Sequence, residues 1–305
     1  MRTLAPGKVV LSGAYSVLDG APALVAAVDR YVLVDSNREG ELLTDEVKAA
    51  GITVPYWFDA SALRHADRKL GLGSSAAILV ATLAAQRLNQ PLPPLLESLD
   101  EYVYPLALAA HQKAQGGGSG IDVAAACYGG FLHFSVQANG TRVQRIDVPT
   151  GLILEVWTAP QSASTAFMLA QVRDYKLHSP DDHRRDLTAQ ATAAESTAQA
   201  WAHGDNLGIL RGLTAQRHAL QRLGKNAGIP IVTPQVVALA ERAERLGAAI
   251  LPAGAGGGDI TLYVGTDPSH GITDDMAKQG HTRLPMILGA AGVHAEVNAR
   301  KYLRL

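Results

Sequence analysis

The chain has 305 residues, 47% of them hydrophobic and 18% charged, which is enough for two closely packed domains with a sizeable core. Its formal net charge of −1 excludes the basic excess of a typical nucleic-acid-binding protein, so any anion site must be local. The single cysteine, Cys127, excludes internal disulfides and thiolate metal clusters, and we expect it to be a buried apolar residue. Because no signal peptide or membrane-length apolar run is found, we expect a soluble, cytoplasmic protein.

The first half of the chain mixes predicted strands and helices. Two segments rich in Val, Leu and Ala, 7–13 and 23–35, are predicted strands, and short strands and loops are expected over 36–68. The other expected elements are helices over 75–88, 94–113 and 121–127 and a hairpin of 131–136 with 142–148 around the turn Asn139-Gly140.

The composition changes near residues 149–151, where we place a boundary between two domains, 1–150 and 151–305. The second half is predicted to be mainly helical. Its expected elements are strands over 152–158, 248–251 and 260–264, helices over 163–177, 185–203, 206–225 and 234–247, and a helix and a last strand in the tail 276–305. The pattern is that of an α+β protein with two domains.

The most informative segment is Gly-Leu-Gly-Ser-Ser-Ala-Ala at 71–77, which continues into an apolar helical run without a turn signal. Glycines let the backbone approach a ligand closely, and a helix that starts beside them directs unpaired N–H groups at one point. Such a point binds phosphate. Taken alone, the segment favours a phosphate site over a turn of small residues that packs a helix on a sheet.

Two further glycine-rich loops each carry a carboxylate. The loop 115–120 leads to Asp122, which is either a helix cap or a group that accepts a hydroxyl proton, and the spacing leaves both open. The loop 252–259 contains three adjacent glycines before Asp259, and their entropic cost indicates close packing against another segment or a ligand.

Lys8 follows Pro6-Gly7 at the head of the first predicted strand. A lysine there is usually a solvated strand end, but beside phosphates it would stabilise transferred negative charge. The chain has no Walker-type Gly-x-x-x-x-Gly-Lys-Ser/Thr segment and no His-Arg-Asp or Asp-Phe-Gly motif, which excludes the P-loop NTPases and the protein kinases.

Pro-Gly-Lys, Gly-Leu-Gly-Ser-Ser-Ala-Ala, Gly-Ser-Gly-x-Asp and Gly-Ala-Gly-Gly-Gly-Asp occur in this order along the chain. The set resembles that of the GHMP kinases, the family of galactokinase, homoserine kinase, mevalonate kinase and phosphomevalonate kinase. The resemblance implies a ribosomal-protein-S5-like N-terminal domain and a ferredoxin-like C-terminal α/β sandwich. It also implies ATP and Mg²⁺ as cofactors and a small-molecule substrate, with no nucleic acid or membrane as partner. A homodimer is left open.

The resemblance implies roles for individual residues. Asp122 would orient or deprotonate the acceptor oxygen, and Lys8 would stabilise the transition state. Nucleotide would be bound by Lys69, Gly71, Leu72, Gly73, Ser74, Ser75 and Ala76, with the Ser75 hydroxyl toward the metal. Substrate would be bound by Ser119, Gly120, Ser164, Gly256, Gly257 and Asp259.

Within the family the chain is most similar to the phosphomevalonate kinase branch. Lys69 before the first loop, HQKAQGGGSGID at 111–122 and Ser-Ala-Ser-Thr at 162–165 carry this likeness. It implies phosphorylation of 5-phosphomevalonate. The alternatives are mevalonate kinase, another kinase of small alcohols or sugars, the related diphosphomevalonate decarboxylase, and a ligand-sensing homologue without catalysis.

Two positions depart from mevalonate kinases. Gly13-Ala14-Tyr15 stands where they usually have Gly-Glu-His, and His111 stands where they place a Mg²⁺-binding Glu, eleven residues before Asp122. The metal would therefore have fewer protein ligands, which Mg²⁺ tolerates because it keeps waters and nucleotide oxygens. We expect His111 to be structural, and the short segment between Tyr31 and Lys69 leaves the acceptor in question.

Charged residues of the second half are ambiguous. The segment 181–185 is predicted to be a capped, solvated helix end rather than a metal or phosphate site. Arg173 and Lys176 would share one helix face and are either surface charges or a site for a phosphorylated acceptor.

Overall fold

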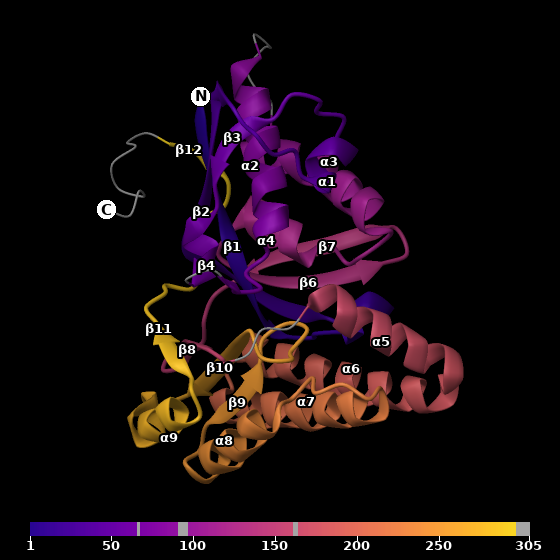
Figure 1. The fold of residues 1–305 in the computed structure, drawn as a ribbon. Helices are drawn as coiled ribbons and strands as arrows, with labels where there is room; N and C mark the ends of the chain where they lie inside the picture. Colours follow the sequence, from indigo (N-terminus) through magenta and orange to yellow (C-terminus); the bar gives the residue numbers. More distant parts are fainter. Residues whose placement is uncertain (66–67, 91–96, 161–163, 297–305) are drawn as a thin grey trace.

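The computed structural model describes the chain apart from residues 66–67, 91–96, 161–163 and 297–305. It contains two larger antiparallel sheets, one built mainly from each half of the sequence (Figure 1). Short 3₁₀ turns at Ser16–Asp19, Ser61–Leu63 and Ser269–Gly271 join some of the elements. In the described part of the chain, no helix combines the length and apolarity that are needed to cross a bilayer.

The first sheet has the order β12-β1-β2-β6-β7, with β3 also paired to β2. Its strands are β1 (Arg2–Ser12), β2 (Ala23–Glu39), β3 (Tyr56–Asp59), β6 (Phe131–Gln137), β7 (Gly140–Ile146) and β12 (His294–Ala295). The first strand begins at Arg2, earlier than predicted. Pro6 does not end the strand but lies inside it, at a register shift between Pro6 and Lys8. Lys8 is therefore not at the head of the strand but midway along it, beside this irregularity.

Helices of the first half cover this sheet. They are α1 (Asp45–Ala49), α2 (Ser74–Asn89), α3 (Leu99–Gln115) and α4 (Ile121–Tyr128), and the small hairpin of β4 (Arg64–His65) with β5 (Arg68–Lys69) precedes α2. The many alanines of α2 are buried against β1 and β2. The helix predicted from residue 94 begins at Leu99, because Ser98 and Glu101 form a capping box there; residues 94–96 lie outside the described part.

The second sheet has the order β11-β8-β10-β9. Its strands are β8 (Ile153–Thr158), β9 (Ala249–Pro252), β10 (Ile260–Gly265) and β11 (Thr282–Leu284). The helices of this half are α5 (Thr165–His178), α6 (Pro180–Ala202), α7 (Asn206–Asn226), α8 (Pro234–Arg245) and α9 (Thr273–Lys278). Figure 1 shows α6, α7 and α8 together on one side of this sheet. The helix predicted from residue 185 begins at Pro180, since proline fits the first helical position.

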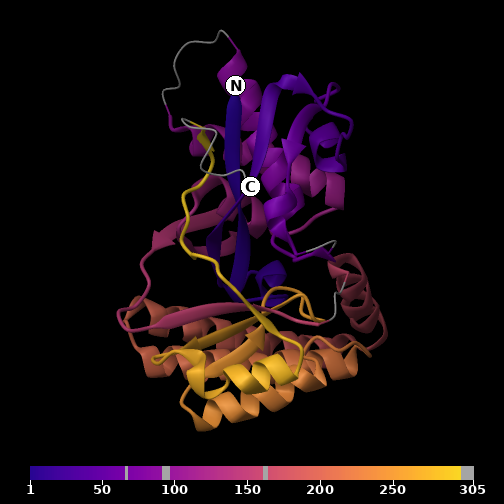
Figure 2. The same cartoon turned by 60° about the vertical axis from the view of Figure 1, so that its left-hand side comes forward.

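The predicted α+β architecture is confirmed. The tail was expected to hold a helix and one last strand, but it forms two strands after α9. After β11 the chain runs back to the first sheet, where His294 pairs with Leu4 (Figure 2). A single apolar cluster contains Val25 and Leu79 of the first half and Val156 and Leu262 of the second. The two halves thus share a core, and the domain boundary at 150/151 stays a prediction.

A buried glutamine on α7 joins the two halves. The Gln216 side chain accepts a hydrogen bond from the Gly13 N–H at 2.8 Å and donates to the hydroxyls of Ser12 at 2.8 Å and Thr197 at 3.0 Å. Gln216 is 1% exposed, so water cannot replace these bonds. This network fixes the end of β1 relative to α6 and α7.

We expect Gln216→Ala to lower the free energy of unfolding by about 1–3 kcal/mol, because it leaves buried groups of both halves without partners. Urea denaturation measures this loss. The control is Gln199→Ala on the exposed face of α6, which should change the stability by less than about 0.5 kcal/mol. Equal losses in the two variants would contradict the structural role of Gln216.

Candidate active site

The three glycine-rich loops meet at one cavity of about 610 Å³ between the halves. The N-termini of α2, α4 and α5 all lie at its wall, with Ser74, Ile121 and Thr165 among the lining residues. Unpaired N–H groups and the positive ends of helix dipoles are therefore directed into a common space. This arrangement suits a ligand with several negative charges.

The first loop ends at Gly73, which caps α2 in the left-handed conformation, with φ of 75°. L-residues other than glycine rarely adopt this conformation. A Cβ atom at Gly73 would lie 3.2 Å from the Lys8 side chain and 3.3 Å from Asp122 Oδ2, so the glycine also makes room for these charges. At Gly71, a Cβ would lie 3.0 Å from Asp259 Oδ2, which places the third loop against the first.

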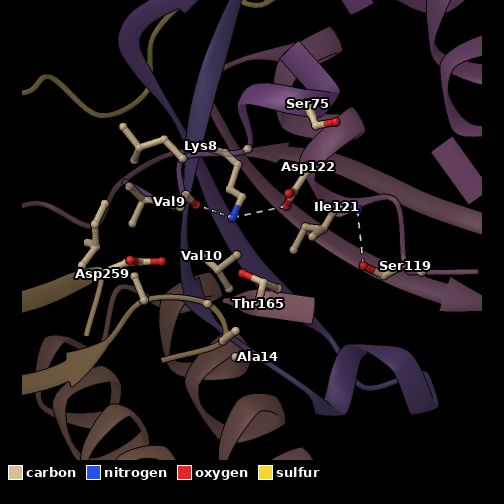
Figure 3. A pocket seen from close by; sticks show the side chains of 18 of the residues that line it. Lys8, Val9, Val10, Ala14, Ser75, Ser119, Ile121, Asp122, Thr165 and Asp259 are labelled. Carbon is tan, nitrogen blue, oxygen red and sulfur yellow. Dashed lines mark hydrogen bonds and ion pairs between the residues drawn. The ribbon is translucent and has the colours of Figure 1, made fainter. Parts of the chain in front are cut away.

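Lys8 and Asp122 form an ion pair inside the cavity (Figure 3). Their Nζ and Oδ1 atoms are 3.4 Å apart, and the Lys8 ammonium also donates a hydrogen bond to the Gly71 carbonyl at 3.2 Å. The Lys8 side chain is 11% exposed and that of Asp122 31% exposed, so the carboxylate is the more accessible partner. A lysine from β1 and a carboxylate from the first turn of α4 thus face the first glycine loop together.

Behind Ser75 lies a carboxylate that the sequence did not point to, Glu46 of α1. Burial disfavours its charged form, but hydrogen bonds from the side chains of Ser75 and Gln115 outweigh this effect and lower the pKa of Glu46. His111 Nδ1 lies 4.0 Å from Glu46 Oε1. His111 lines the cavity itself, so it lies at the site although we expected only a structural role.

A strained turn closes another side of the cavity. Tyr15 has φ of 64° and ψ of −54°, and Ser16 N donates to Ala14 O at 2.8 Å across it, which defines a γ-turn of the rare type. The Tyr15 hydroxyl donates to the Ala255 carbonyl at 2.7 Å, and Gln190 of α6 donates to Ala14 O. Burial raises the pKa of Tyr15, which keeps the hydroxyl protonated as a donor. The turn therefore links the end of β1 to the third loop.

Most of the site residues predicted from the sequence line this one cavity. They are Lys8, Lys69, Gly71, Leu72, Gly73, Ser74, Ser75, Ser119, Gly120, Asp122, Gly256 and Asp259. The structure brings these residues together, and their individual roles stay predictions.

Three predicted residues lie elsewhere. Ala76 is buried within α2, Gly257 donates its N–H to the Ile231 carbonyl at 3.0 Å, and Ser164 accepts from Phe167 N as the cap of α5. Thr165 lines the cavity instead, and it could have been found from its place at a helix start after a strand. Ser162 and Ala163 of the same motif lie outside the described residues.

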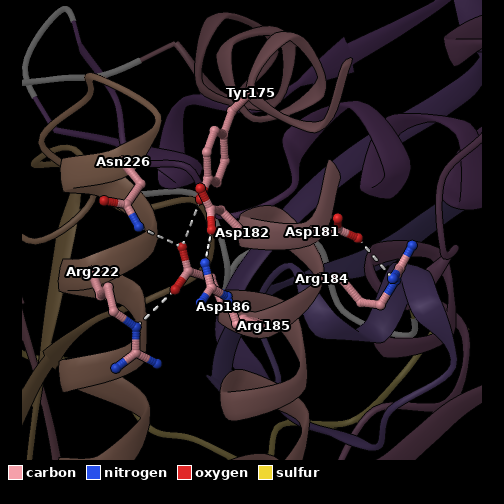
Figure 4. Close-up of polar contacts among 8 residues, drawn as sticks. All are labelled: Tyr175, Asp181, Asp182, Arg184, Arg185, Asp186, Arg222 and Asn226. Carbon is pink, nitrogen blue, oxygen red and sulfur yellow. Dashed lines mark hydrogen bonds and ion pairs between the residues drawn. The ribbon is translucent and has the colours of Figure 1, made fainter. Parts of the chain in front are cut away.

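The charged segment 181–185 is a helix end with local ion pairs, as predicted. Arg184 pairs with Asp181 and Arg185 with Asp182, and these side chains are largely exposed. The next residue, Asp186, is buried and receives hydrogen bonds from Tyr175, Arg222 and Asn226, which ties α5, α6 and α7 together (Figure 4).

Arg173 and Lys176 lie on α5 and are exposed, and neither is among the described residues that line the cavity. The sequence left two interpretations of these residues open, and their positions favour the one in which they are surface charges. Cys127 is buried, as expected, and burial raises the pKa of its thiol.

Together the fold and the cavity form a site between the two halves that is suited to a small, strongly anionic molecule. Residues 54–130 match the family model of the GHMP kinases N terminal domain. The chain therefore contains a GHMP kinase N-terminal domain, a domain found in phosphotransferases. The family predicted from the sequence motifs is thus confirmed.

Among known proteins, a phosphomevalonate kinase of Streptomyces sp. is 29% identical over 85% of this chain and 88% of its own length. A mevalonate kinase of Thermococcus onnurineus is 30% identical over 57% of this chain and 62% of its own length. The solved structure of Streptococcus pneumoniae phosphomevalonate kinase in complex with phosphomevalonate and AMPPNP covers 94% of this chain and 99% of that one. It has a TM-score of 0.79 at 17% identity, which shows the same fold.

The crowding at Gly73 predicts that a substitution there weakens nucleotide binding in addition to its effect on stability. Gly73→Ala and Gly51→Ala both force alanine into positive φ, at 75° and 82°, and each should cost about 1–2 kcal/mol of stability. Only Gly73 has Lys8 and Asp122 beside it, whereas a Cβ at Gly51 meets no described heavy atom within 4 Å. We therefore expect ATP affinity, measured by calorimetry, to fall roughly tenfold or more in Gly73→Ala alone. Unchanged affinity in Gly73→Ala would contradict the location of the phosphates.

Proposed function

We propose that this protein is an ATP-dependent kinase that phosphorylates 5-phosphomevalonate to 5-diphosphomevalonate. The observation that carries the proposal is the Lys8–Asp122 pair beside the N-terminus of α2 in a single cavity. Phosphoryl transfer needs in-line placement and charge stabilisation more than covalent chemistry by the protein. The similarity to a phosphomevalonate kinase over most of both chains supports the choice of acceptor.

In the proposed arrangement, the phosphates of ATP lie against the first loop and the start of α2. Backbone N–H groups and the side chains of Lys69, Ser74 and Ser75 would neutralise their charge. The acceptor oxygen would lie at Asp122, between the first and second loops. Lys8 would hold Asp122 in position and stabilise the negative charge of the transferring phosphoryl group.

The ionisation state of the acceptor decides whether Asp122 has to act as a base. A phosphate monoester has its second pKa at about 6 and is largely ionised at neutral pH, whereas the hydroxyl of mevalonate is not. With a phosphate as acceptor, Asp122 would mainly orient the oxygen together with Lys8. With an alcohol as acceptor, Asp122 would have to remove a proton in the transition state.

Divalent magnesium fits the oxygen-rich part of the site. The Ser75 hydroxyl and its carboxylate neighbour Glu46 are the hard oxygen donors that this cation prefers. Ser75 would hold the metal together with oxygens of the nucleotide. The bound cation would supply positive charge beside the phosphates.

Mevalonate is the second candidate acceptor, since a mevalonate kinase is 30% identical over more than half of this chain. The deciding experiment measures ADP release with mevalonate, 5-phosphomevalonate, homoserine and galactose as separate acceptors. We expect 5-phosphomevalonate to give the highest kcat/KM. A preference for another acceptor would replace the proposed substrate, and ATP binding without ADP release would favour a non-catalytic homologue.

Asp122→Ala should lower kcat by about 100-fold or more while ATP affinity stays within about twofold of the unaltered protein. The reason is that Asp122 would lie on the acceptor side of the cavity in the proposed arrangement, and its ion pair is with Lys8. Steady-state kinetics and nucleotide titration measure the two quantities. The control is Asp181→Ala, an exposed carboxylate at the start of α6. Near-normal kcat in Asp122→Ala would refute its assigned role.

A further inference from the structure

Glu46 is a buried carboxylate next to the proposed nucleotide site. Its side chain is 8% exposed and lies in the first turn of α1, a short helix that contacts α2 and α3. Thr44 caps this helix by accepting a hydrogen bond from Val47 N, which fixes where the turn begins. The position of Glu46 therefore results from local capping and from packing on two longer helices.

The neighbours of Glu46 do not neutralise it. Gln115 Nε2 donates to Glu46 Oε1 at 3.0 Å, and the nearby Ser75 side chain helps to lower the pKa of Glu46. Within the described part of the chain, its ionic contact is with His111 Nδ1 at 4.0 Å, and no lysine or arginine is paired with it. A buried carboxylate in such surroundings is costly unless a cation compensates it.

His111 supplies an independent observation at the same place. Its side chain is 9% exposed, and Nδ1 is buried without a hydrogen-bond partner although it faces the carboxylate. The ring also lines the cavity. The unsatisfied nitrogen and the buried carboxylate beside the phosphate loop would both gain a partner if a ligand brings a cation into this space.

The chemistry of the donor set points to a hard divalent cation. Mg²⁺ in nucleotide sites is held by one or two protein oxygens together with phosphate oxygens, at about 2.0–2.1 Å. Ser75, Gln115 and His111 line the cavity, and Gln115 and His111 also contact Glu46. The Glu46 carboxylate therefore lies directly behind the part of the cavity wall that Ser75 belongs to.

We propose that Glu46 is the protein carboxylate of the divalent-cation site, with Ser75 as its neighbouring ligand. The proposal rests on the proposed kinase function and adds a metal ligand to it. The carboxylate comes from α1, and His111, which faces it, comes from α3. Segments that are distant in the sequence thus meet at one place in space.

The experiment compares binding of the non-hydrolysable analogue AMPPNP with and without Mn²⁺, measured by calorimetry, and follows bound Mn²⁺ by electron paramagnetic resonance. In the unaltered protein we expect Mn²⁺ to strengthen analogue binding roughly tenfold or more. In Glu46→Gln the analogue should bind without metal as before, within about twofold, and the gain from Mn²⁺ should be lost. The control is Asp45→Asn, which removes the same charge one residue away from an exposed side chain and should behave as the unaltered protein.

Each alternative result has a definite meaning. A folded Glu46→Gln protein that keeps the gain from Mn²⁺ overturns the assignment, and so does one that binds the analogue more weakly to the same degree with and without metal. Circular dichroism checks the fold. If Glu46→Gln does not fold, Glu46→Asp is the second variant, because it retains the charge but shortens the side chain. It should lose most of the gain in AMPPNP binding from Mn²⁺. An unaltered protein that binds no AMPPNP in either condition overturns the kinase function and this assignment together.

Discussion

The site depends on an ion pair between residues that are far apart in the sequence, Lys8 and Asp122. Opposite charges that are partly withdrawn from water attract each other strongly, but only if the backbone holds both ends in place. Lys8 is held by β1, and Asp122 by the first turn of α4. The core packing of α4 and α2 against β1 therefore has to be exact, and the alanine-rich surfaces of these helices permit that close approach.

The shared core and the hydrogen bonds between the two halves make the cavity a property of both halves. Gln216 holds the end of β1, and Tyr15 reaches from the same end to the third glycine loop. The strain of the γ-turn at Tyr15 persists because contacts from α6 and from the third loop surround it. One wall of the site thus consists of connecting segments that hydrogen bonds from other elements hold in place.

Electrostatics divides the cavity into two parts. Lys8 and Asp122 compensate each other on the side of the second loop, where an acceptor would be oriented. On the other side of Ser75, the carboxylate of Glu46 faces His111 and has no lysine or arginine partner within the described part of the chain. Figure 3 shows the Ser75 hydroxyl directed away from the Lys8 ammonium, in keeping with this division. In the proposed function, a protein with a formal net charge of −1 would bind a polyanion and its cation through local fields.

The amino-acid sequence by itself determined the α+β class, the likeness to one kinase family and twelve of the residues that line the cavity. This succeeded because glycine loops before helices are local signals: the residues that bind phosphate are neighbours in the chain. The tertiary structure alone decided the positions of Glu46, Tyr15 and the returning strand β12, and it showed that Ser164 caps α5. Those features depend on contacts between distant segments, and a short helix or a lone tyrosine carries no periodic pattern that reveals which segment it will meet.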